Sequence, residues 1–600
     1  MQTQEEVARP LTQVPQSQPS GKMEKREERH KIDGGLGEGY SSAMALGVGA
    51  ARNQPPPLEG YDLFTENRPL VEALRREGGA AWEERASALG VELGGDPLEW
   101  GRLANVNPPV LRSHDRYGER LDEVEFHPAW HALMALGVRH GLHALPWREP
   151  QPGAHVARAA MFVTYSQVEQ GSGCPLSMTH AAVPALRAEP DVAAEWEPRL
   201  ASLRYEPRLL PAAEKESALC GMAMTEKQGG SDVRANESVA QPLGDGEFLL
   251  TGHKWFCSAP MCDAFLVLAY APGGLSCFLL PRVLPDGARN DFRIQRLKDK
   301  LGNRSNASAE IEFEGAWAQL VGEEGTGVRT IIEMVNHTRL DCVLGSTALM
   351  RRAVAEATHH TAHRAAFGRL LAEQPLMLNV LADLCIESEA ATVTALRVAR
   401  AFDDGDAAFR RLATAVAKYW VCRVAPGHVA EALECIGGNG YVEESVLPRL
   451  YREAPVNSVW EGAGNIQCLD VLRAVQKQPE SLDAFLAEVE LAAGADLRLD
   501  AAITELRSEL ADREDVELRA RRTVERLATC LQGSLLVRHA PPEVADAYCA
   551  TRLGGEGGRA YGTLPRGLDL AAIVERHRPH VTGRSHARPT PVEWNETARS

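Results

Sequence analysis

A single carboxylate in residues 434–467 has the surroundings of a catalytic base. Glu461 follows an apolar run that ends in Trp460, and the three residues after it, 462–464, are Gly-Ala-Gly. Small residues beside an acid allow a flat ligand to approach the backbone closely. An apolar neighbour raises the pKa of a carboxyl group, as a general base that works near neutral pH requires. Taken alone, the glutamate of a Trp-Glu-Gly tripeptide more often caps the next helix or is exposed to solvent at its end.

Two further stretches carry groups that could bind a planar, polar ligand. Residues 222–234, MAMTEKQGGSDVR, offer the hydroxyls of Thr225 and Ser231 and a glycine pair whose backbone N–H groups could donate to carbonyl or phosphate oxygens. Residues 252–260, GHKWFCSAP, place two aromatic side chains and Ser258 on the following strand, which suits a flat ring. A hairpin loop and an aromatic core strand are the alternative interpretations.

Residues 364–374 form a third candidate segment. RAAFG (364–368) supplies an arginine and a phenylalanine that could stack on a ring, and Gln374 adds an amide within the same helix-loop-helix. Surface use of such residues is common, so this segment predicts a ligand contact only together with the others.

The sequence does not indicate metal or nucleotide-loop chemistry. His359, His360 and His363 fall on one helix, where i,i+4 histidines can bind a metal, but no acidic partner or HExxH pattern accompanies them. The Gly-rich runs match neither GxGxxG after a strand nor a Walker A loop, and there is no GxSxG or catalytic-cysteine signature. We therefore expect no metal site and no Rossmann or P-loop nucleotide site.

The hydrophobic pattern predicts the elements that must position these groups. At 600 residues the chain is too long for one hydrophobic core, and its Ala, Leu, Arg and Glu content favours helices. Apolar spacing is helical before residue 215 and after residue 326, whereas short strands fill 218–320. We expect a mainly α protein with a middle antiparallel β-domain. The predicted units are a disordered extension (1–52), an α-helical domain (53–215), the β-domain (216–325), a helical bundle (326–478) and an appended helical domain (479–600).

Composition indicates the cellular compartment and limits the kinds of partner that the protein could bind. Twelve cysteines are scattered singly with no CxxC pair, which favours a reducing environment over a disulfide framework or a zinc ribbon. No apolar run reaches 18 residues and the N-terminus lacks an apolar core, so we expect a cytoplasmic protein without a membrane span or signal peptide. The net charge of −17 argues against a chain that is basic all over. Nucleic-acid binding would need positive charge gathered on one face.

Taken together and in order, these segments resemble the acyl-CoA dehydrogenase superfamily and, within it, the AidB branch, the flavoproteins of the adaptive response to alkylating agents. The resemblance runs from about Asn53 to near the C-terminus and rests on long matches, which are GRLANVNPP, FHPAWH, MTEKQGGSD, GHKWF, RLKDKLGNRSNAS, GGNGYVEES, LPRLYREAPVNS and WEGAGNI. It implies an acyl-CoA dehydrogenase-like fold whose bundle has four helices, with an extra C-terminal helical domain. It also implies a homotetramer, a dimer of dimers, that holds FAD at a subunit contact and binds double-stranded DNA.

The resemblance also implies roles for residues of this chain. Glu461 matches the catalytic base, whereas the alternative base position of the isovaleryl-CoA type is Thr338 and carries no carboxylate. Thr225 and Ser231 would lie near the flavin and the substrate, and Ser258 would replace the usual Thr beside flavin N5. The implied FAD-binding residues are Met224, Thr225, Gly230, Ser231, Phe256, Cys257, Ser258, Arg364, Phe367, Gln374, Gly438, Gly462 and Asn465.

Two features of this assignment concern how the cofactor is shared and held. Arg364, Phe367 and Gln374 match the motif that reaches the pyrophosphate and adenine side of FAD from a neighbouring subunit. Glu434 departs from the glutamine that the family usually has before the Gly-Gly turn, which leaves its contact with FAD open.

Three functions are compatible with these residues. The first is a DNA-associated flavoprotein of the response to DNA alkylation, with weak, isovaleryl-type acyl-CoA dehydrogenase activity. The second is a metabolic acyl-CoA dehydrogenase without a DNA role, and the third is a DNA-binding protein whose FAD is structural. The arginines expected to contact DNA phosphates are Arg473, Arg519, Arg521, Arg522 and Arg526. The alternative is that these arginines pair with nearby acids, namely Asp512, Glu514, Asp515 and Glu517.

Overall fold

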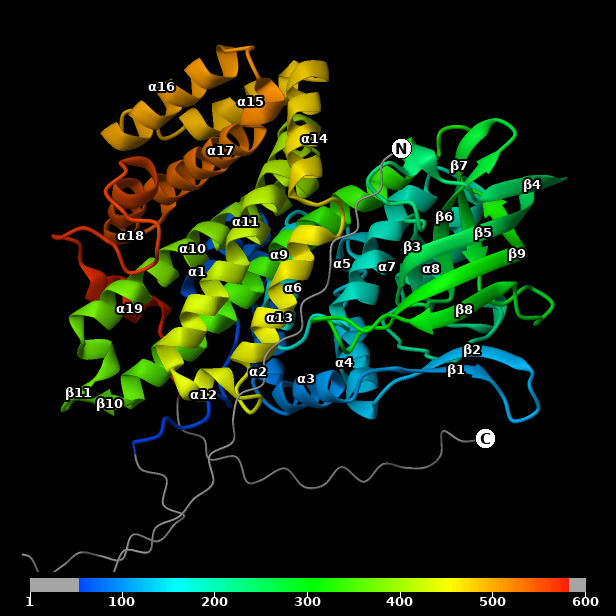
Figure 1. Cartoon of the computed structure of the whole chain (residues 1–600), viewed down its shortest axis with the longest axis horizontal. Helices are drawn as coiled ribbons and strands as arrows, with labels where there is room; N and C mark the ends of the chain where they lie inside the picture. Colours follow the sequence, from blue (N-terminus) through cyan, green and yellow to red (C-terminus); the bar gives the residue numbers. More distant parts are fainter. Residues whose placement is uncertain (1–52, 582–600) are drawn as a thin grey trace, which may run out of the picture. The chain divides into compact units, whose positions relative to one another are not determined.

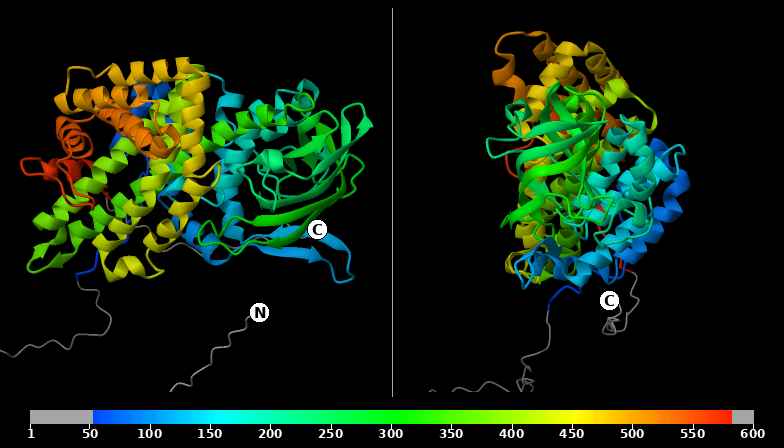
Figure 2. Two further views of the ribbon diagram at one scale, coloured as in Figure 1. Left: turned by 45° about the horizontal axis from the view of Figure 1, so that its top comes forward. Right: turned by 90° about the vertical axis from the view of Figure 1, so that its right-hand side faces the viewer.

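The computed structural model describes residues 53–581, so the predicted extension 1–52 lies outside the described residues. The unit is mainly helical, with one large sheet at one end of its long axis and stacked helices at the other (Figure 1). Figure 2 shows the same division from two further directions. Within residues 53–581, no helix combines the length and the apolar character that crossing a bilayer requires.

Two of the N-terminal helices, α6 and α7, lie between the sheet and the long central helices (Figure 1). α6 and α7 are buried along almost their whole length, because α7 packs on β3 on one side and α9 on the other while α6 packs on α9 and α10. Their near-continuous apolar sequence suits a helix that is covered all round. The helices of this part are α1 (Arg68–Leu74), α2 (Glu83–Leu93), α3 (Pro97–Val106), α4 (Pro128–Arg139), α5 (Leu145–Arg148), α6 (Ala154–Ser166), α7 (Gly173–Leu186) and α8 (Pro190–Leu200).

A β-hairpin interrupts these helices where the sequence pattern predicts none. β1 (Val110–His114) and β2 (Arg120–Glu125) pair antiparallel and lie along β8 (Figure 1). The Asp122 carboxylate accepts a hydrogen bond from the Ile294 N–H at 3.0 Å, which ties the hairpin to the sheet. Most residues of both strands stay exposed or half-buried, so they carry no clear apolar alternation and periodicity could not reveal them.

Seven strands build the middle sheet. Five of them close into a ring in the order β6–β4–β5–β9–β7, with β3 added beside β6 and β8 beside β9. All pairings are antiparallel except β3–β6 and β4–β6, so the β-domain expected from the sequence is present with two parallel pairings in addition. The strands are β3 (Cys220–Ala223), β4 (Val239–Gly244), β5 (Glu247–Ser258), β6 (Ala264–Ala271), β7 (Gly274–Pro281), β8 (Phe292–Leu297) and β9 (Ser308–Leu320).

Long helices pack around α9 on the other side of α6 and α7. Residues 337–355 of α9 are buried on every face, because α6, α7, α10, α11 and α13 surround this helix. The elements of this part are α9 (Gly327–His363), the small hairpin β10 (Ala365–Ala366) and β11 (Arg369–Leu370), α10 (Pro375–Asp403), α11 (Ala407–Ile436), α12 (Gly438–Tyr441) and α13 (Leu447–Val459).

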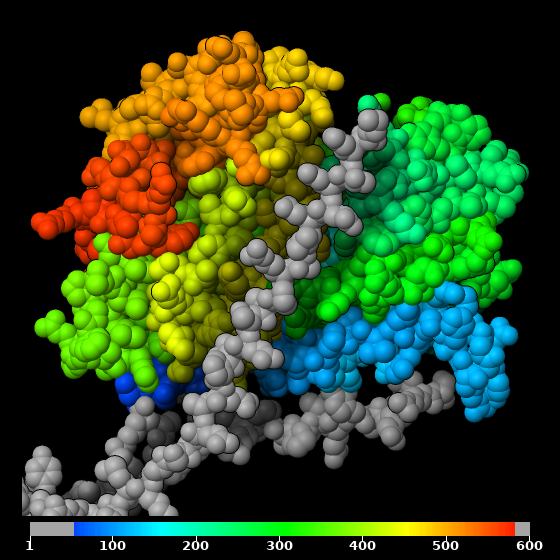
Figure 3. All heavy atoms as spheres, viewed as in Figure 1, coloured from blue at the N-terminus to red at the C-terminus, as the bar shows by residue number. Residues whose placement is uncertain are grey.

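The C-terminal helices pack onto the bundle. Partly buried ion pairs fasten them to α10, with Arg552 to Asp383 at 2.6 Å and Arg576 to Glu389 at 2.9 Å. Figure 3 shows their atoms, in orange and red, lying against the yellow-green bundle. They are α14 (Gly464–Lys477), α15 (Pro479–Glu490), α16 (Leu497–Ala511), α17 (Val516–His539), α18 (Pro542–Tyr548) and α19 (Leu570–His577).

Candidate active site

Glu461 lies in the short link between α13 and α14, where the backbone turns sharply. Its φ is 58°, in the left-handed region, and Gly462 follows with a φ of 97°. Glycine adopts this conformation freely, whereas a glutamate does so at a cost of roughly 1–3 kcal/mol. Such strain persists only where surrounding contacts hold it, and it concentrates at functional sites.

Three side chains hold this turn in place. Arg339 of α9 donates to the Glu461 carbonyl at 3.2 Å, and the buried Lys418 of α11 donates to the Gly462 carbonyl at 2.6 Å. The Gln467 amide donates to both carbonyls at 2.9 Å. Two helices of the bundle and the first turns of α14 therefore fix the direction of the Glu461 side chain.

The Glu461 carboxyl is poorly solvated. The residue is half-buried as a whole, but its Oε2 is shielded from solvent and has no hydrogen-bond partner among residues 53–581. Burial raises the pKa of Glu461, and the Thr338 hydroxyl, Lys418 and Arg339 offset part of that rise. A carboxylate that is desolvated yet still attracts protons strongly has the character of a general base.

The loop after β3 offers polar groups beside a close backbone approach. Met224 and Thr225 are half-buried, and the Thr225 carbonyl accepts the Trp255 N–H at 2.8 Å. A Cβ atom on Gly230 would lie 2.3 Å from the Thr225 Oγ1, so a side chain at Gly230 would displace that hydroxyl. Gly230 and Ser231 are exposed. The loop thus presents hydroxyl and backbone N–H groups at the surface beside β5.

The end of β5 turns an aromatic ring outward. Phe256 is 53% exposed and Ser258 is half-buried, while the Cys257 side chain points into the core. The Lys298 Nζ lies 4.7 Å from the centre of the Phe256 ring. Because side chains alternate along a strand, only the backbone of Cys257 is available on the face that Phe256 and Ser258 share.

A buried thiol connects this strand with the Glu461 turn. Burial raises the pKa of Cys174, at the start of α7, to about 12, and the neighbouring Ser258 hydroxyl and Glu461 charge also act on it. Ser258 and Glu461 therefore lie around the same side chain. This brings together the expected partner of flavin N5 and the expected base.

The other expected cofactor residues lie elsewhere in the chain. Arg364 donates to the Asn53 carbonyl at 2.6 Å, and Gln374 donates to the Ala366 carbonyl at 3.2 Å. Phe367 is 99% exposed at the tip of the β10–β11 hairpin. This hairpin and α12, which begins at Gly438, lie at the opposite end of the unit from β5 (Figure 1). One chain therefore does not gather all the residues expected to bind FAD.

Asn465 lies closer to the Glu461 turn but is already engaged. Its side-chain oxygen accepts a hydrogen bond from Arg521 of α17 at 2.8 Å. Gly462 belongs to the strained turn itself. The cofactor contacts expected of these two residues stay predictions.

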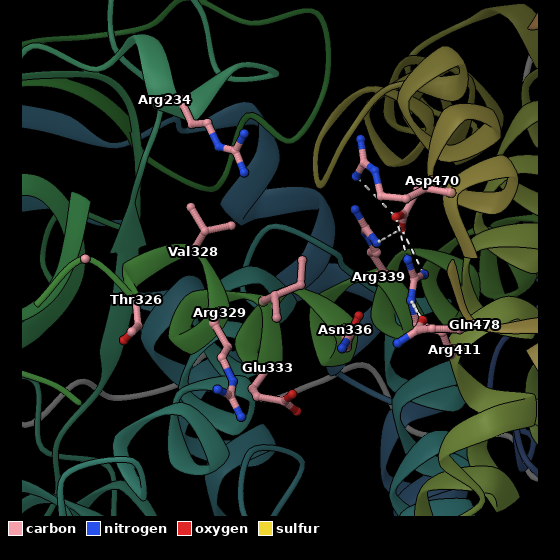
Figure 4. A pocket seen from close by; sticks show the side chains of 13 residues that line it. Arg234, Thr326, Val328, Arg329, Glu333, Asn336, Arg339, Arg411, Asp470 and Gln478 are labelled. Atoms are coloured by element: carbon pink, nitrogen blue, oxygen red, sulfur yellow. Dashed lines mark hydrogen bonds and ion pairs between the residues drawn. The ribbon is translucent and has the colours of Figure 1, made fainter. Parts of the chain in front are cut away.

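A strongly basic pocket is lined by Arg339, which also contacts the Glu461 carbonyl. Its volume is about 640 Å³, and Figure 4 shows Arg234 reaching in from the β-domain side opposite Arg339, Arg411 and Asp470. Asp470 accepts from Arg339 at 2.8 Å and from Arg411 at 2.7 Å. The charged lining residues are Arg234, Arg329, Arg339, Arg411 and Arg473 against Glu333 and Asp470. The excess of arginine suits an anionic ligand.

The arginines expected to contact DNA are largely paired. Glu509 of α16 lies within 4.0 Å of Arg519, Arg522 and Arg526, and Glu505 lies 3.1 Å from Arg526. Arg519 also contacts the Asp512 carboxylate at 3.2 Å and donates to the Glu514 carbonyl at 2.6 Å.

The acids in these pairs differ from most of those expected. Of the four acids suggested by the sequence, Asp512 contributes its carboxylate and Glu514 a backbone oxygen. Glu505 and Glu509 come from the preceding helix, α16, which packs on α17. Arg473 and Arg522 stay 62% and 66% exposed.

Several residues of the site were not found from the sequence. Lys418, Gln467 and Asp470 hold the turn and the pocket, and Arg234 and Arg329 line that pocket. Lys418 lies far in the sequence from the turn that it contacts, and Arg234 lies far from the other residues of the pocket. A local sequence pattern cannot show that such distant residues meet. A single lysine inside the apolar run of α11, LATAVAKYWV, is the one local signal of a buried charge.

Three domain families match consecutive parts of the chain. The adaptive response protein AidB N-terminal domain matches residues 53–207, the acyl-CoA dehydrogenase middle domain matches 221–316, and the acyl-CoA dehydrogenase C-terminal domain matches 325–476. The last two ranges contain the β5 strand and the Glu461 turn.

Curated relatives and solved structures agree with these families. The AidB protein of Escherichia coli (strain K12) is 48% identical over 514 residues, covering 84% of this chain and 94% of that protein. Acyl-CoA dehydrogenase family member 11 of Caenorhabditis elegans is 30% identical over 77% of this chain and 82% of its own length. The crystal structure of Caenorhabditis elegans ACDH-11 in complex with C11-CoA matches with a TM-score of 0.77 and 26% identity, over 86% of this chain and 94% of that one.

The residues around Glu461 and β5 fit a flavin. In one region, Phe256 offers a flat exposed ring, Ser258 a polar contact, and Glu461 a carboxyl oxygen that has no partner within residues 53–581. An acyl-CoA dehydrogenase complexed with FAD from Bacillus anthracis shares the fold at a TM-score of 0.60 and 17% identity, over 76% of this chain and 87% of that one. The match to the acyl-CoA dehydrogenase middle and C-terminal domain families, together with these residues, identifies FAD as the cofactor. The chain belongs to the acyl-CoA dehydrogenase family of flavin oxidoreductases, as a member of its AidB type.

Proposed function

We propose that Glu461 is the base that removes the α-proton of an acyl-CoA thioester. The observation that carries this proposal is the buried Oε2 without a hydrogen-bond partner within residues 53–581, on a strained turn that Lys418, Arg339 and Gln467 hold in place. A base must be fixed against the substrate, because misplacement by about 1 Å can cost on the order of a hundredfold in rate.

The protein's own groups account for the proton abstraction. Glu461 takes the proton from the α-carbon, and the electron pair of that C–H bond forms the new double bond as the β C–H pair leaves as hydride. Bound FAD supplies the two-electron acceptor for that hydride. The Glu461 N–H donates to no acceptor among residues 53–581, so it is free to polarise the thioester carbonyl.

The basic pocket supports an acyl-CoA as the substrate class. Phosphate groups prefer arginine clusters, which donate bidentate hydrogen bonds. Arg339 both lines the pocket and contacts the Glu461 carbonyl, so a ligand anchored there would extend toward the base. The relative from Caenorhabditis elegans was solved with C11-CoA. We propose weak activity on isovaleryl-CoA and expect a panel of chain lengths to identify better substrates.

The purified protein tests this function directly. We expect a yellow FAD-loaded protein whose visible absorption bleaches anaerobically on addition of at least one acyl-CoA, with formation of the enoyl-CoA product. Free coenzyme A, which has the phosphates but no acyl chain, is the control and should leave the flavin oxidised. A yellow protein that no acyl-CoA bleaches would contradict the proposal and favour a structural FAD.

As a second function we propose binding of double-stranded DNA in the response to alkylation damage. Arg473 of α14 and Arg522 of α17 are more than 60% exposed, and their helices pack side by side. Arg521 of α17 reaches α14 as well, in contact with Asn465. Against this, Glu505, Glu509 and Asp512 offset much of the charge of the other arginines. These residues therefore suit non-specific contacts with DNA phosphates, and such binding weakens steeply as the salt concentration rises.

Duplex DNA retardation at two salt concentrations tests the second function. The variant Arg473→Gln, Arg522→Gln should bind less tightly than the parent at low salt. Arg204 and Arg208 lie after α8 and are 74% and 70% exposed, so Arg204→Gln, Arg208→Gln is a control with the same change of charge. If both variants retard duplex DNA equally, or if the FAD-loaded parent does not retard it at all, the DNA-binding proposal is contradicted. The function would then be that of a metabolic acyl-CoA dehydrogenase.

We further propose that a second copy of the chain completes the FAD site. The separation of the β10–β11 hairpin and α12 from β5 supports this, as do the exposed Phe367, Leu376 and Tyr441 at 99%, 83% and 77%. A homotetramer built as a dimer of dimers would provide the contact. Light scattering should give a mass of four chains, and Phe367→Ser should weaken both assembly and FAD retention. A monomer that keeps FAD would contradict the shared site.

A further inference from the structure

Three histidines from three helices meet in the core far from one another in sequence. His155 opens α6, His180 lies in α7 and His337 lies in α9, and one nitrogen of each ring lies within 4.8 Å of the others. The ring centres are 5.1 Å apart for His180 and His337, and 5.8 and 5.9 Å for the pairs that include His155. His180 is 1% and His337 6% exposed, while His155 is half-buried.

The cluster contains a buried ring nitrogen that the described part of the fold leaves without a partner. The buried Nδ1 of His180 has no hydrogen-bond partner within residues 53–581. Burial lowers the pKa of all three rings, that of His155 to about 3 and those of His180 and His337 well below their ordinary value. Neutral imidazoles with free lone pairs are the form that binds transition metals. A core of this size would be stabilised more simply by aliphatic side chains, since a buried nitrogen without a partner is costly.

We propose that His155, His180 and His337 bind one divalent transition-metal ion, with Zn²⁺ as the ion that they fit. Zn²⁺ accepts three imidazole ligands with a water as the fourth, at Zn–N distances of about 2.0–2.1 Å. Tetrahedral coordination then sets the nitrogens roughly 3.4 Å apart. The rings would move inward by about 1 Å each to reach that spacing, which small rotations of the side chains can provide.

The surroundings can accommodate the added charge. The Arg158 guanidinium is already paired with Asp341 at 2.8 Å, and the Asp403 carboxylate accepts the backbone N–H of His155 at 2.9 Å. Arg410 is the remaining cation that faces the cluster within residues 53–581. An aromatic shell of Trp147, stacked 4.9 Å from His180, and Phe402, 4.7 Å from His337, shields the site from bulk water. Half-buried His155 is the side from which an ion can enter.

Bound zinc would fasten the N-terminal helices to α9. His337 directly precedes Thr338 and Arg339, which act on Glu461 from the same helix. The ion would thus stabilise the part of α9 that positions the base without touching the substrate.

The histidines near the end of α9 differ from this cluster. The rings of His359 and His363 lie 4.5 Å apart on α9, but the His359 Nε2 bonds the Pro56 carbonyl and the His363 Nδ1 bonds the His359 carbonyl. These nitrogens are already engaged. The sequence-based expectation of no metal site rested on these neighbouring histidines alone. The ligands proposed now are spread over residues 155–337, so no local pattern in the sequence connects them.

Zinc binding by the FAD-loaded full-length protein tests this proposal. After chelation and desalting, the parent should bind one Zn²⁺ per chain by calorimetry and by elemental analysis, and its unfolding temperature should rise with added zinc. X-ray absorption at the zinc edge should give about three nitrogen neighbours at 2.0–2.1 Å. His155→Gln, at the half-buried position, and His337→Gln should each weaken zinc binding at least about tenfold. The flavin spectrum should be unchanged, which shows that these variants are folded.

A double variant provides the matched control. His359→Gln, His363→Gln removes two imidazoles from the same helix and should keep parent-like zinc affinity. No zinc on the FAD-loaded parent, or parent-like affinity in His155→Gln and His337→Gln, would overturn the proposal. Sulfur or carboxylate neighbours in the absorption spectrum would place the ion elsewhere and overturn it as well. If both histidine variants fail to hold FAD, the stoichiometry and ligand type of the parent still decide.

Discussion

The Glu461 turn and the arginines of α17 place charge in opposite surroundings. Glu461 presents a shielded Oε2 without a partner in the described part of the chain, on a strained backbone, at a cost in folding stability. Arg519, Arg522 and Arg526 instead lie near the surface and share Glu509. With Glu505 and Asp512 this offsets much of their charge, and such pairs add little to stability. A fold keeps an unfavourable group only where something else requires it. The turn therefore carries the stronger functional argument.

A large loss is expected even when the carboxylate of the turn is only moved and not removed. Glu461→Asp shortens the side chain by one methylene, which withdraws the base from the substrate by about 1.5 Å and should slow flavin reduction on the order of a hundredfold. Stopped-flow absorption measures the rate. FAD content should match the parent, and a rate within about twofold of the parent would mean that the position of the carboxyl does not matter.

Removing an anchor of the turn should cost stability and rate together. Lys418→Met leaves the Gly462 carbonyl with only Gln467 as donor within residues 53–581. We expect the free energy of unfolding to fall by about 1–3 kcal/mol, as for a broken buried hydrogen bond, and flavin reduction to slow. Denaturant unfolding gives the first quantity. Exposed Lys477→Met is the control and should change neither.

The raised pKa of Glu461 should be visible in the pH dependence of both rate and stability. Burial lifts it above its ordinary 4.5, so flavin reduction should increase with pH as this group deprotonates. The folded state holds the proton more tightly than the unfolded chain. Protonated Glu461 thus contributes its full stabilisation of the folded state below pH 4.5. This contribution is lost as the pH rises through the pKa that Glu461 has in the folded protein.

The variant Glu461→Gln isolates this linkage. As the pH rises from 4.5 through the pKa of Glu461 in the folded protein, the parent should lose stability relative to the variant, because the glutamine side chain has no proton to lose. Unfolding measured at several pH values gives the difference. A parent whose stability relative to the variant stays constant, or increases, with rising pH would contradict a raised pKa at this site.

The smallest effects are expected on the arginine face. Removing one contact with a DNA phosphate should lower the slope of log affinity against log salt by about 1, and should weaken binding modestly at low salt. For Arg522→Gln alone we expect a few-fold weaker duplex binding by fluorescence anisotropy. Arg519 is 23% exposed and held by Asp512, so Arg519→Gln should change DNA affinity less. The reverse order would mean that paired arginines, and not exposed ones, contact DNA.

The sequence predicted the desolvated surroundings of Glu461 better than the geometry of its turn. The apolar Trp460 and the glycines around Glu461 indicated a desolvated acid, and the ordered motifs identified the family, its fold and FAD. The left-handed backbone of Glu461 is not a property of the local sequence, since glutamate avoids it. Lys418 and Arg339 impose it from two other helices.

Other features escaped the sequence for related reasons. The β1–β2 hairpin lacks a buried face, and the closure of the sheet depends on pairing between β6 and both β4 and β7. The histidine cluster depends on how α6, α7 and α9 cross. Long-range packing of this kind leaves no periodic signal in one chain. The domain boundaries, the cofactor contacts of the individual residues and the DNA-binding face remain predictions.

The assignment of Glu461 as the base is tested most directly by anaerobic flavin reduction in Glu461→Gln. The amide keeps the shape of the side chain but cannot accept the proton, so bleaching by isovaleryl-CoA, or by the best acyl-CoA of the panel, should slow by at least about 10²–10⁴-fold. Glu444→Gln makes the same change at an exposed position of the α12–α13 link and should bleach like the parent. A Glu461→Gln protein that keeps its FAD and bleaches as fast as the parent would show that another group removes the proton.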